Sequence, residues 1–285
     1  MIKKIHNPEE FEIACRQCAK TRAIAKFLDR VYPRIRAVPG ICQCCNRVRF
    51  FRNDLLYCFK DDPVCKINFR ERMICPVCQL NNRMRATFAT IVGEMKRHPH
   101  GDLLIYEMIT PFYRWLSERI RKLGGNIVGS EYLGSDYEPG CIINGIRHEN
   151  ATALSFEDRS FDVVASLDVF EHIPNIVSAA QEMFRVLRPG GTAVFTVPND
   201  PHRLQSLQRA KIENGEIIHL EEPEIHGNPL DASGSLAFWT VGWDIIDTMR
   251  MAGFDDVYAE PAGKVIYGNI QPWPNLIFFA HKARD

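Results

Sequence analysis

The fold of this chain is decided by the stretch LSFEDRSFDVVASLDVFEHIP at Leu154–Pro174, together with RVLRPGG at Arg185–Gly191 and TAVFTVP at Thr192–Pro198. Residues 161–167 are a short apolar run that ends before an aspartate. This is typical of a buried parallel strand whose carboxyl end opens into a ligand crevice. Residues 175–187 carry apolar side chains at helical spacing, and Pro-Gly-Gly ends that helix before the next apolar strand. The sequence therefore predicts a βαβ unit.

This unit closely resembles the central motifs of the class I S-adenosylmethionine-dependent methyltransferases, in the branch that contains many small-molecule methylases. With its flanks, the resemblance covers residues 101–284. It implies an α/β fold, a doubly wound, seven-stranded and mostly parallel sheet of the Rossmann-like methyltransferase type, and S-adenosylmethionine as the cofactor. The third strand of this sheet is expected at residues 142–146. In that family the last strand inserts antiparallel beside the sixth, and residues 256–260 and 275–281 are the candidates for the sixth and the last strand here.

Four segments are expected along the chain of 285 residues. Residues 1–38 are predicted to form an N-terminal helical segment, 39–80 a cysteine-rich zinc-binding module, 81–100 a linking helix, and 101–285 the methyltransferase domain. Within that domain, residues 199–239 lack regular periodicity. Because long loops at the rim of a site usually carry function, we predict that this insertion is a lid over the acceptor pocket.

Charge divides the chain into two unlike halves, although the formal net charge is zero. Residues 1–100 hold 20 Lys and Arg against 9 Asp and Glu, whereas residues 101–285 hold 15 against 26. Such a split favours either a basic module that meets an anionic partner or two halves that attract each other. No apolar stretch reaches 18 residues and the first residues lack the apolar core of a signal peptide, so we expect a cytoplasmic protein without a membrane partner.

Nine of the ten cysteines lie in the first 78 residues. Cys42-Gln-Cys-Cys45 and Cys75-Pro-Val-Cys78 are two paired knuckles, and four thiolates in this arrangement match a closed, tetrahedral structural zinc site. We predict Cys42, Cys45, Cys75 and Cys78 as the zinc ligands. Aromatic residues around the knuckles are expected to pack a small core that the metal completes: Phe50, Phe51, Tyr57, Phe59 and Phe69.

The other cysteines of this region leave alternatives open. Cys44 can replace a neighbouring ligand. Cys58 and Cys65 are either part of the site or buried thiols, because free cysteine packs as a small hydrophobe. Cys15 and Cys18 lie in a helical stretch, where a core role is favoured over metal binding.

Arginines crowd the same module and alternate with aromatic residues, as Arg47, Arg49, Arg52, Arg70, Arg72, Arg83 and Arg85. This is the composition of a nucleic-acid surface, where guanidinium groups meet phosphates and rings stack on bases. The alternative is that the arginines at 70–85 dock the module onto the acidic half. No known nucleic-acid motif matches.

The resemblance places cofactor contacts at successive strand ends. The implied set is Glu107, Thr110, Glu131, Asn150, Ala151, Asp168 and Phe170. A carboxylate at Glu131 can accept hydrogen bonds from both ribose hydroxyls. Asn150 stands where the family commonly has Asp, and its side-chain oxygen can still accept from the adenine amino group, while the amide of Ala151 meets the ring. The turn at 108–111 contains no glycine, although the family's turn is glycine-rich.

Two histidines are the predicted catalytic residues. His172 follows the fourth strand, where the methyl group and the acceptor should meet, and an imidazole there can deprotonate a hydroxyl or amine. Its structural alternative is to cap or pack a helix. His226, in the predicted lid, can bind the acceptor or act as the base, as can His219. We favour an acceptor lid over a metal site there, because the histidines show no metal-ligand spacing with a third partner.

The leading functional prediction is therefore an S-adenosylmethionine-dependent methyltransferase that acts by in-line transfer on a small molecule or carbohydrate. One alternative is an RNA methyltransferase that grips its substrate with the basic zinc module. Another is a non-catalytic binding protein that kept the fold. The sequence leaves open a homodimer.

Overall fold

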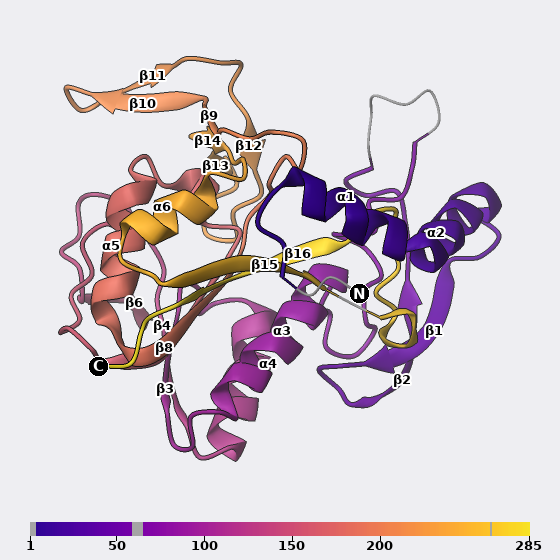
Figure 1. The fold of residues 1–285 in the computed structure, drawn as a ribbon, viewed down its shortest axis with the longest axis horizontal. Coiled ribbons are helices and arrows are strands. Elements are labelled where there is room, and N and C mark those ends of the chain that lie inside the picture. Colours follow the sequence, from indigo (N-terminus) through magenta and orange to yellow (C-terminus); the bar gives the residue numbers. More distant parts are fainter. Residues whose placement is uncertain (1–3, 59–64, 263) are drawn as a thin grey trace.

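A mixed, six-stranded sheet forms the centre of the computed structural model, which describes residues 4–58, 65–262 and 264–285 (Figure 1). The strand order is β15-β16-β8-β7-β3-β4. The strands are β3 (Asp102–Ile105), β4 (Asn126–Gly129), β7 (Phe161–Leu167), β8 (Leu187–Thr196), β15 (Asp256–Ala262) and β16 (Asn275–His281). Phe59, one of the aromatic residues expected in the small core, lies outside the described residues.

The sheet has the mixed strand directions that the resemblance implied. β3, β4, β7 and β8 run parallel, and β16 pairs antiparallel with both β8 and β15. Val163, Val164 and Ala165 of β7 are all fully buried, because helices cover both faces of the sheet at this strand. Rossmann-like methyltransferase architecture is therefore present.

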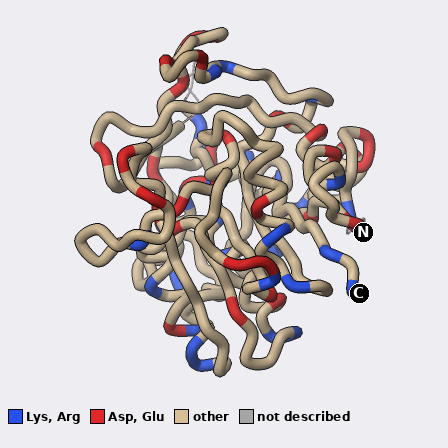
Figure 2. Tube along the Cα trace, turned by 90° about the vertical axis from the view of Figure 1, so that its left-hand side faces the viewer, with Lys and Arg blue, Asp and Glu red and all other residues tan. Residues whose placement is uncertain are grey.

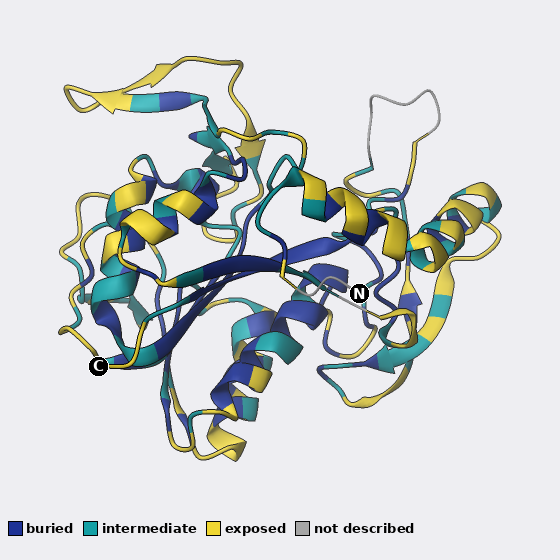
Figure 3. Ribbon diagram, viewed as in Figure 1, coloured by how far each residue is buried: buried dark blue, intermediate teal, exposed yellow. Residues whose placement is uncertain are grey.

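The described part of the chain contains six α-helices, which pack against the sheet or beside it: α1 (Pro8–Gln17), α2 (Ala19–Val31), α3 (Asn82–Met95), α4 (Pro111–Lys122), α5 (Ile176–Val186) and α6 (Ile245–Met251). α1, α5 and α6 share a core with Leu104 and Val164 of the sheet. α2, α3 and α4 belong to the core that contains Leu103 and Val163. Since adjacent strand residues face opposite sides, these helices cover two faces, and the strands between them are buried (Figure 3).

The expectation of seven strands is wrong for the described sheet, which has six. The third strand was expected at 142–146, but β5 (Ile142–Ile143) and β6 (Ile146–Arg147) instead form a separate antiparallel hairpin. Asn144 and Gly145 have φ of 51° and 79°, a left-handed turn that reverses the chain. Among the described residues, one parallel bridge, from Glu131 to His148, extends the sheet beyond β4.

A second difference concerns the Pro-Gly-Gly sequence at residues 189–191. It was predicted to end the helix before the strand, but α5 already ends at Val186 and β8 begins at Leu187. Pro-Gly-Gly therefore lies inside β8, where the pairing with β7 shifts register between Phe161 and Val163. Gly190 has φ of 79°, which a residue with a side chain rarely adopts.

The N-terminal part contributes to the main core as well as to the cysteine module. Ile5 exchanges two backbone hydrogen bonds of 2.8 Å with Ala259 of β15. Phe11 of α1 packs near Trp243, with ring centroids 6.1 Å apart. The module itself is built on the hairpin of β1 (Ala37–Cys42) and β2 (Arg47–Arg52).

The segment predicted as a lid forms short antiparallel pairs: β9 (Leu207–Gln208), β10 (Ala210–Glu213), β11 (Glu216–His219), β12 (Ile225–His226), β13 (Ser235–Leu236) and β14 (Trp239–Thr240). The β10–β11 hairpin projects from the molecule and is almost wholly exposed (Figures 1 and 3). Two short 3-10 helices complete the elements, η1 (Phe170–His172) and η2 (Val265–Tyr267). Within the described residues, no helix combines the length and apolar character needed to cross a bilayer.

Candidate functional site

The predicted cofactor carboxylates meet at one edge of the sheet because the parallel strands are in register. Ile105 of β3 pairs with Gly129 of β4 and with Ala165 of β7. Glu107 and Glu131 lie two residues beyond these pairs, and Asp168 lies three residues beyond. The carboxyl ends of parallel strands are where ligands bind in open α/β sheets.

Glu107 has one carboxylate oxygen with a partner and one without. Its Oε2 accepts a hydrogen bond of 2.6 Å from Thr110 Oγ1, whereas its Oε1 is buried and has no hydrogen-bond partner. Burial, with the nearby charge of Glu131, raises the pKa of Glu107 to about 7 from its ordinary 4.5. Thr110 also begins α4, because its hydroxyl accepts from the backbone N–H of Tyr113 at 3.2 Å.

Glu131 holds the glycine-free turn in place. Its Oε1 accepts backbone hydrogen bonds from Met108 at 2.7 Å and Ile109 at 3.1 Å. Burial raises the pKa of Glu131, and these two hydrogen bonds oppose that rise. The turn itself has no glycine, but it packs closely against Gly129 of β4, where an added Cβ would lie 2.7 Å from the carbonyl oxygen of Glu107. A cofactor that binds Glu131 must use its other oxygen or displace the turn.

Asp168 is bound by arginines of the N-terminal region. Arg70 donates two hydrogen bonds of 2.8 and 2.9 Å to the two oxygens of Asp168. Arg83 lies 3.2 Å from the same carboxylate, and Thr196 Oγ1 donates to it at 2.8 Å. These charges hold the pKa of Asp168 well below its ordinary value despite its burial. The cofactor contact predicted for Asp168 stays a prediction, and any such contact must compete with Arg70.

The remaining predicted cofactor residues have local partners. Asn150 Oδ1 accepts from the backbone and hydroxyl of Thr152, at 3.0 and 2.8 Å, so the oxygen expected to meet adenine closes a turn. Ala151 is half-buried against the core. Phe170 is fully buried, 5.2 Å from Phe195 between ring centroids, which makes it a core residue in this structure.

The structure brings His172 and His226 together with Glu171, a residue that the sequence prediction did not include. The two imidazole rings lie 5.0 Å apart between centroids, although 54 residues separate them in the chain. The nearby carboxylate of Glu171 is the main cause that raises the pKa of His226 to about 9. The adjacent position of Glu171 and His172 was the signal in the sequence. His219, by contrast, is exposed on β11.

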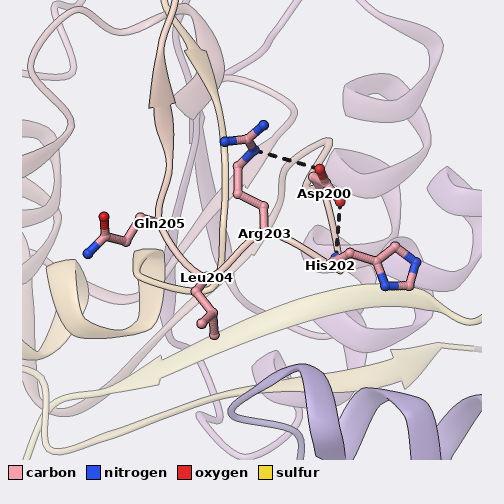
Figure 4. A pocket seen from close by; sticks show the side chains of 5 residues that line it. All are labelled: Asp200, His202, Arg203, Leu204 and Gln205. Carbon is pink, nitrogen blue, oxygen red and sulfur yellow. Dashed lines mark hydrogen bonds and ion pairs between the residues drawn. The ribbon is translucent and has the colours of Figure 1, made fainter.

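Two hollows lie beside the lid. One has a volume of about 220 Å³, and its walls include Glu171, His226, Asn199, Glu224 and Trp239. The other, of about 500 Å³, is lined by Asp200, His202, Arg203, Leu204 and Gln205. In the second, Arg203 lies 3.6 Å from Asp200, and the backbone N–H of His202 donates to Asp200 at 3.0 Å (Figure 4). Neither lining includes Glu107 or Glu131.

The four predicted zinc ligands form one cluster. Cys42 and Cys78 have their sulfurs 3.7 Å apart, and those of Cys45 and Cys75 are 3.8 Å apart. All four sulfurs lie within 4.8 Å of one another. A tetrahedral zinc ion with Zn–S bonds of ~2.3 Å requires sulfurs roughly 3.75 Å apart, so the geometry suits this metal.

The other cysteines stand outside this cluster. Cys58 and Cys65 are joined in a disulfide and are not buried, so neither alternative considered for them describes the structure. Cys44 is buried next to the cluster, and Cys15 is buried against the main core. Burial raises the pKa of Cys15 to about 11, which keeps it protonated.

Several of the module's arginines dock it onto the rest of the protein. Arg85 is fully buried over the ring of Phe51, 3.8 Å from its centroid, and donates to the carbonyl of Gly268 at 3.2 Å. Arg83 is buried between Glu71 and Asp168. Figure 2 shows acidic and basic residues interspersed along the trace. Arg70, Arg83 and Arg85 are therefore internal contacts here, whereas Arg47 and Arg52 on β2 are exposed.

Comparison with known proteins adds the family. Residues 120–195, which include Glu131, Asp168 and most of β8, match the family model described as a methyltransferase domain. Over these residues the chain is similar to methyltransferase domains. Over 170 residues it is 27% identical to a probable S-adenosylmethionine-dependent methyltransferase of Mycolicibacterium smegmatis, a match that covers 51% of this chain and 60% of that protein.

Other relatives match the methyltransferase domain over shorter lengths. An uncharacterized methyltransferase of Mycobacterium sp. strain KMS is 37% identical over 76 residues, which is 24% of this chain and 30% of that protein. Among solved structures, an S-adenosylmethionine-dependent methyltransferase from Mesorhizobium loti covers 69% of this chain and 98% of its own, with 15% identity and a TM-score of 0.43. The chain thus spans less than two thirds of the first two relatives.

Proposed function

We propose that this protein transfers a methyl group from S-adenosylmethionine to a small molecule or carbohydrate. The observation that carries the proposal is the row of carboxylates at the carboxyl edge of β3, β4 and β7, within a chain that matches a methyltransferase family. The fit of the cofactor is supported by Glu107, whose buried Oε1 has no hydrogen-bond partner and can accept from the amino group of the methionine moiety.

The residues at the carboxyl edge have distinct roles in this proposal. Glu131 would accept hydrogen bonds from the ribose hydroxyls, and the backbone at Asn150 and Ala151 would contact the adenine. The bound cofactor supplies an electrophilic methyl group on a sulfonium. The protein's contribution is to hold the acceptor in line and exclude water, a positioning effect that can supply much of the rate enhancement.

His226 is a poor general base in this structure. With no metal bound, its pKa of about 9 leaves it protonated at neutral pH, because Glu171 and Glu224 stabilise the charged ring. In His172, Nδ1 is held 2.8 Å from the carbonyl oxygen of Leu236, so Nε2, which faces Glu171, is the nitrogen that can bind either a proton or a ligand. We propose that acceptors enter by the hollow of about 220 Å³ that Glu171 and His226 line.

The decisive experiment is calorimetry of the intact protein with S-adenosylmethionine and S-adenosylhomocysteine. We expect both to bind with one site per chain, followed by methyl transfer detected by mass spectrometry of small molecules that copurify with the protein. An intact protein that binds neither compound would overturn the proposal and favour the non-catalytic alternative.

The cysteine cluster is proposed to hold a structural zinc ion. Four sulfurs fill all positions of a tetrahedral ion, so this metal would stabilise the module without reaching substrate. RNA as the acceptor receives less support, because Arg70, Arg83 and Arg85 are occupied by internal contacts.

A further inference from the structure

The side chain of Glu171 is buried without a conventional partner. It lies on η1 with 1% of its surface exposed, and neither of its carboxylate oxygens has a hydrogen-bond partner. The backbone at this point is fixed, because the carbonyl of Glu171 accepts from the N–H of Phe238 at 2.7 Å. A buried carboxylate without hydrogen bonds is costly, so the arrangement needs a positive group beside it.

Two imidazole nitrogens face this carboxylate. His172 Nε2 and His226 Nδ1 each lie 3.6 Å from Glu171 Oε1. The opposite nitrogen of each ring is held by an oxygen: His172 Nδ1 lies 2.8 Å from the carbonyl of Leu236, and His226 Nε2 lies 3.0 Å from Glu224 Oε1. Rings held from behind by a carbonyl or carboxylate, with the second nitrogen free to point inward, are typical of metal-bound histidines.

We propose that Glu171, His172 and His226 bind a divalent first-row transition-metal ion, with zinc and manganese as the test ions. Their ligand atoms all lie within 4.8 Å of one another. A tetrahedral zinc ion with bonds of ~2.0–2.1 Å separates its ligands by about 3.3 Å. The two observed distances of 3.6 Å therefore require movements of only a few tenths of an ångström.

The competing explanation is an ion pair between Glu171 and a protonated histidine. A charge-assisted N–H···O hydrogen bond is typically ~2.7–2.9 Å long. Both histidines instead stand 3.6 Å from the same oxygen, at similar distances. Two nitrogens at equal distances from one oxygen, neither within hydrogen-bond range, leave room for an ion beside them.

Three protein ligands leave at least one coordination position for another molecule. Glu171 and His226 also line the hollow of about 220 Å³ beneath the lid, so an ion held by them has access to that space. A bound hydroxyl group loses its proton more readily on such an ion. This consequence rests on the proposed methyl transfer and points to a hydroxyl-bearing acceptor, whereas the metal site itself does not depend on it.

The test measures metal on the full chain, without reference to activity. The zinc-saturated protein is dialysed against a fixed free zinc concentration and its zinc content per chain is determined by mass spectrometry. We expect two zinc ions in the natural protein and one in Glu171→Gln and in His226→Ala. His219→Ala is the matched control, because it removes an exposed histidine of the same lid, and it should keep two.

A second measurement separates the two metal sites. Manganese binds thiolates weakly, so titration of the zinc-loaded protein with Mn²⁺, followed by electron paramagnetic resonance, reports the Glu171 site. We expect affinity to fall at least tenfold in both site variants and to stay unchanged in His219→Ala. His226→Ala provides the readout if Glu171→Gln does not fold, as judged by circular dichroism.

The proposal is overturned by a natural protein that holds one zinc ion and binds no manganese, or by site variants that bind both ions as the natural protein does. Calorimetry with S-adenosylhomocysteine, run on the same samples, keeps this result separate from the proposed function. Loss of metal with intact cofactor binding concerns the metal site alone, and loss of cofactor binding in the natural protein concerns methyl transfer alone.

Discussion

The cysteine cluster and the carboxyl edge of the sheet are both predicted binding sites, but they differ in whether their binding groups already have partners within the protein. In the cluster, two pairs of sulfurs stand 3.7 and 3.8 Å apart, close to the spacing in a zinc site, and all four lie within 4.8 Å of one another. At the edge, Glu131 binds the turn before α4 and Asp168 binds Arg70. The cysteine sulfurs are therefore already close to the positions that a metal ion would need. The carboxylates of Glu131 and Asp168 are instead already bound to other groups of the protein.

The largest expected effect comes from removing a ligand of the cysteine cluster. Cys75→Ser, or a strong chelator, should unfold the N-terminal module, because zinc binding and folding are coupled in such modules. We expect a loss of several kcal/mol in the free energy of unfolding, measured by thermal and urea denaturation. Cys141→Ser, outside the cluster, is the control. A melting curve that chelation does not change would contradict a structural zinc ion in this cluster.

The ion pairs of Asp168 with Arg70 and Arg83 connect the two regions, and breaking them should have the second largest effect. Asp168→Ala leaves the buried Arg83 without one of its two carboxylates, and removing one partner of a buried ion pair costs about 3–5 kcal/mol. Urea unfolding should show this loss. Asp158→Ala removes an exposed carboxylate from Arg185 and should cost less than about 1 kcal/mol. Equal effects of the two changes would mean that Arg70 and Arg83 do not join the module to the sheet.

Cofactor affinity tests the carboxyl edge directly. Glu131→Ala should weaken binding of S-adenosylhomocysteine by about 1.5–3 kcal/mol, which corresponds to roughly tenfold to 150-fold in Kd, if the charged carboxylate binds the ribose. Calorimetry measures the change. Glu157→Ala, an exposed acid of a nearby turn, should leave Kd unaltered. Unchanged affinity in Glu131→Ala would show that Glu131 serves only the turn.

The smallest expected effect is a dependence of stability on pH at Glu107. Its pKa is raised to about 7 in the folded protein from 4.5, so the folded state keeps a proton that the unfolded state releases. Stability should therefore fall as pH rises from about 4.5 to 7 and stay at the lower value above pH 7. Glu107→Gln should remove this fall, a difference of about 1–3 kcal/mol at pH 8. Parallel pH profiles of the two proteins would contradict the raised pKa.

Much of the fold could be predicted because its signals are local. The apolar run at 161–167 became β7 with the same bounds, and residues 275–281 became β16, antiparallel beside β15 as the resemblance implied. The expected third strand failed because Asn144-Gly145 allows a tight turn, and hairpin pairing replaced pairing with β4. Whether this segment forms a hairpin or pairs with the sheet edge depends on the relative free energies of the two pairings, and the spacing of apolar residues does not report that difference.

The cysteine knuckles and the order of the strand-end acids can be read directly from the sequence, since residues two or three positions apart keep their geometry in any fold that forms the turn or strand. The partners that these groups meet depend on tertiary packing. Arg70 reaches Asp168 across 98 residues, and His226 reaches Glu171 through the lid. Such contacts depend on how the helices and hairpins pack against the sheet, and the long-range burial that drives this packing has no fixed spacing in the chain.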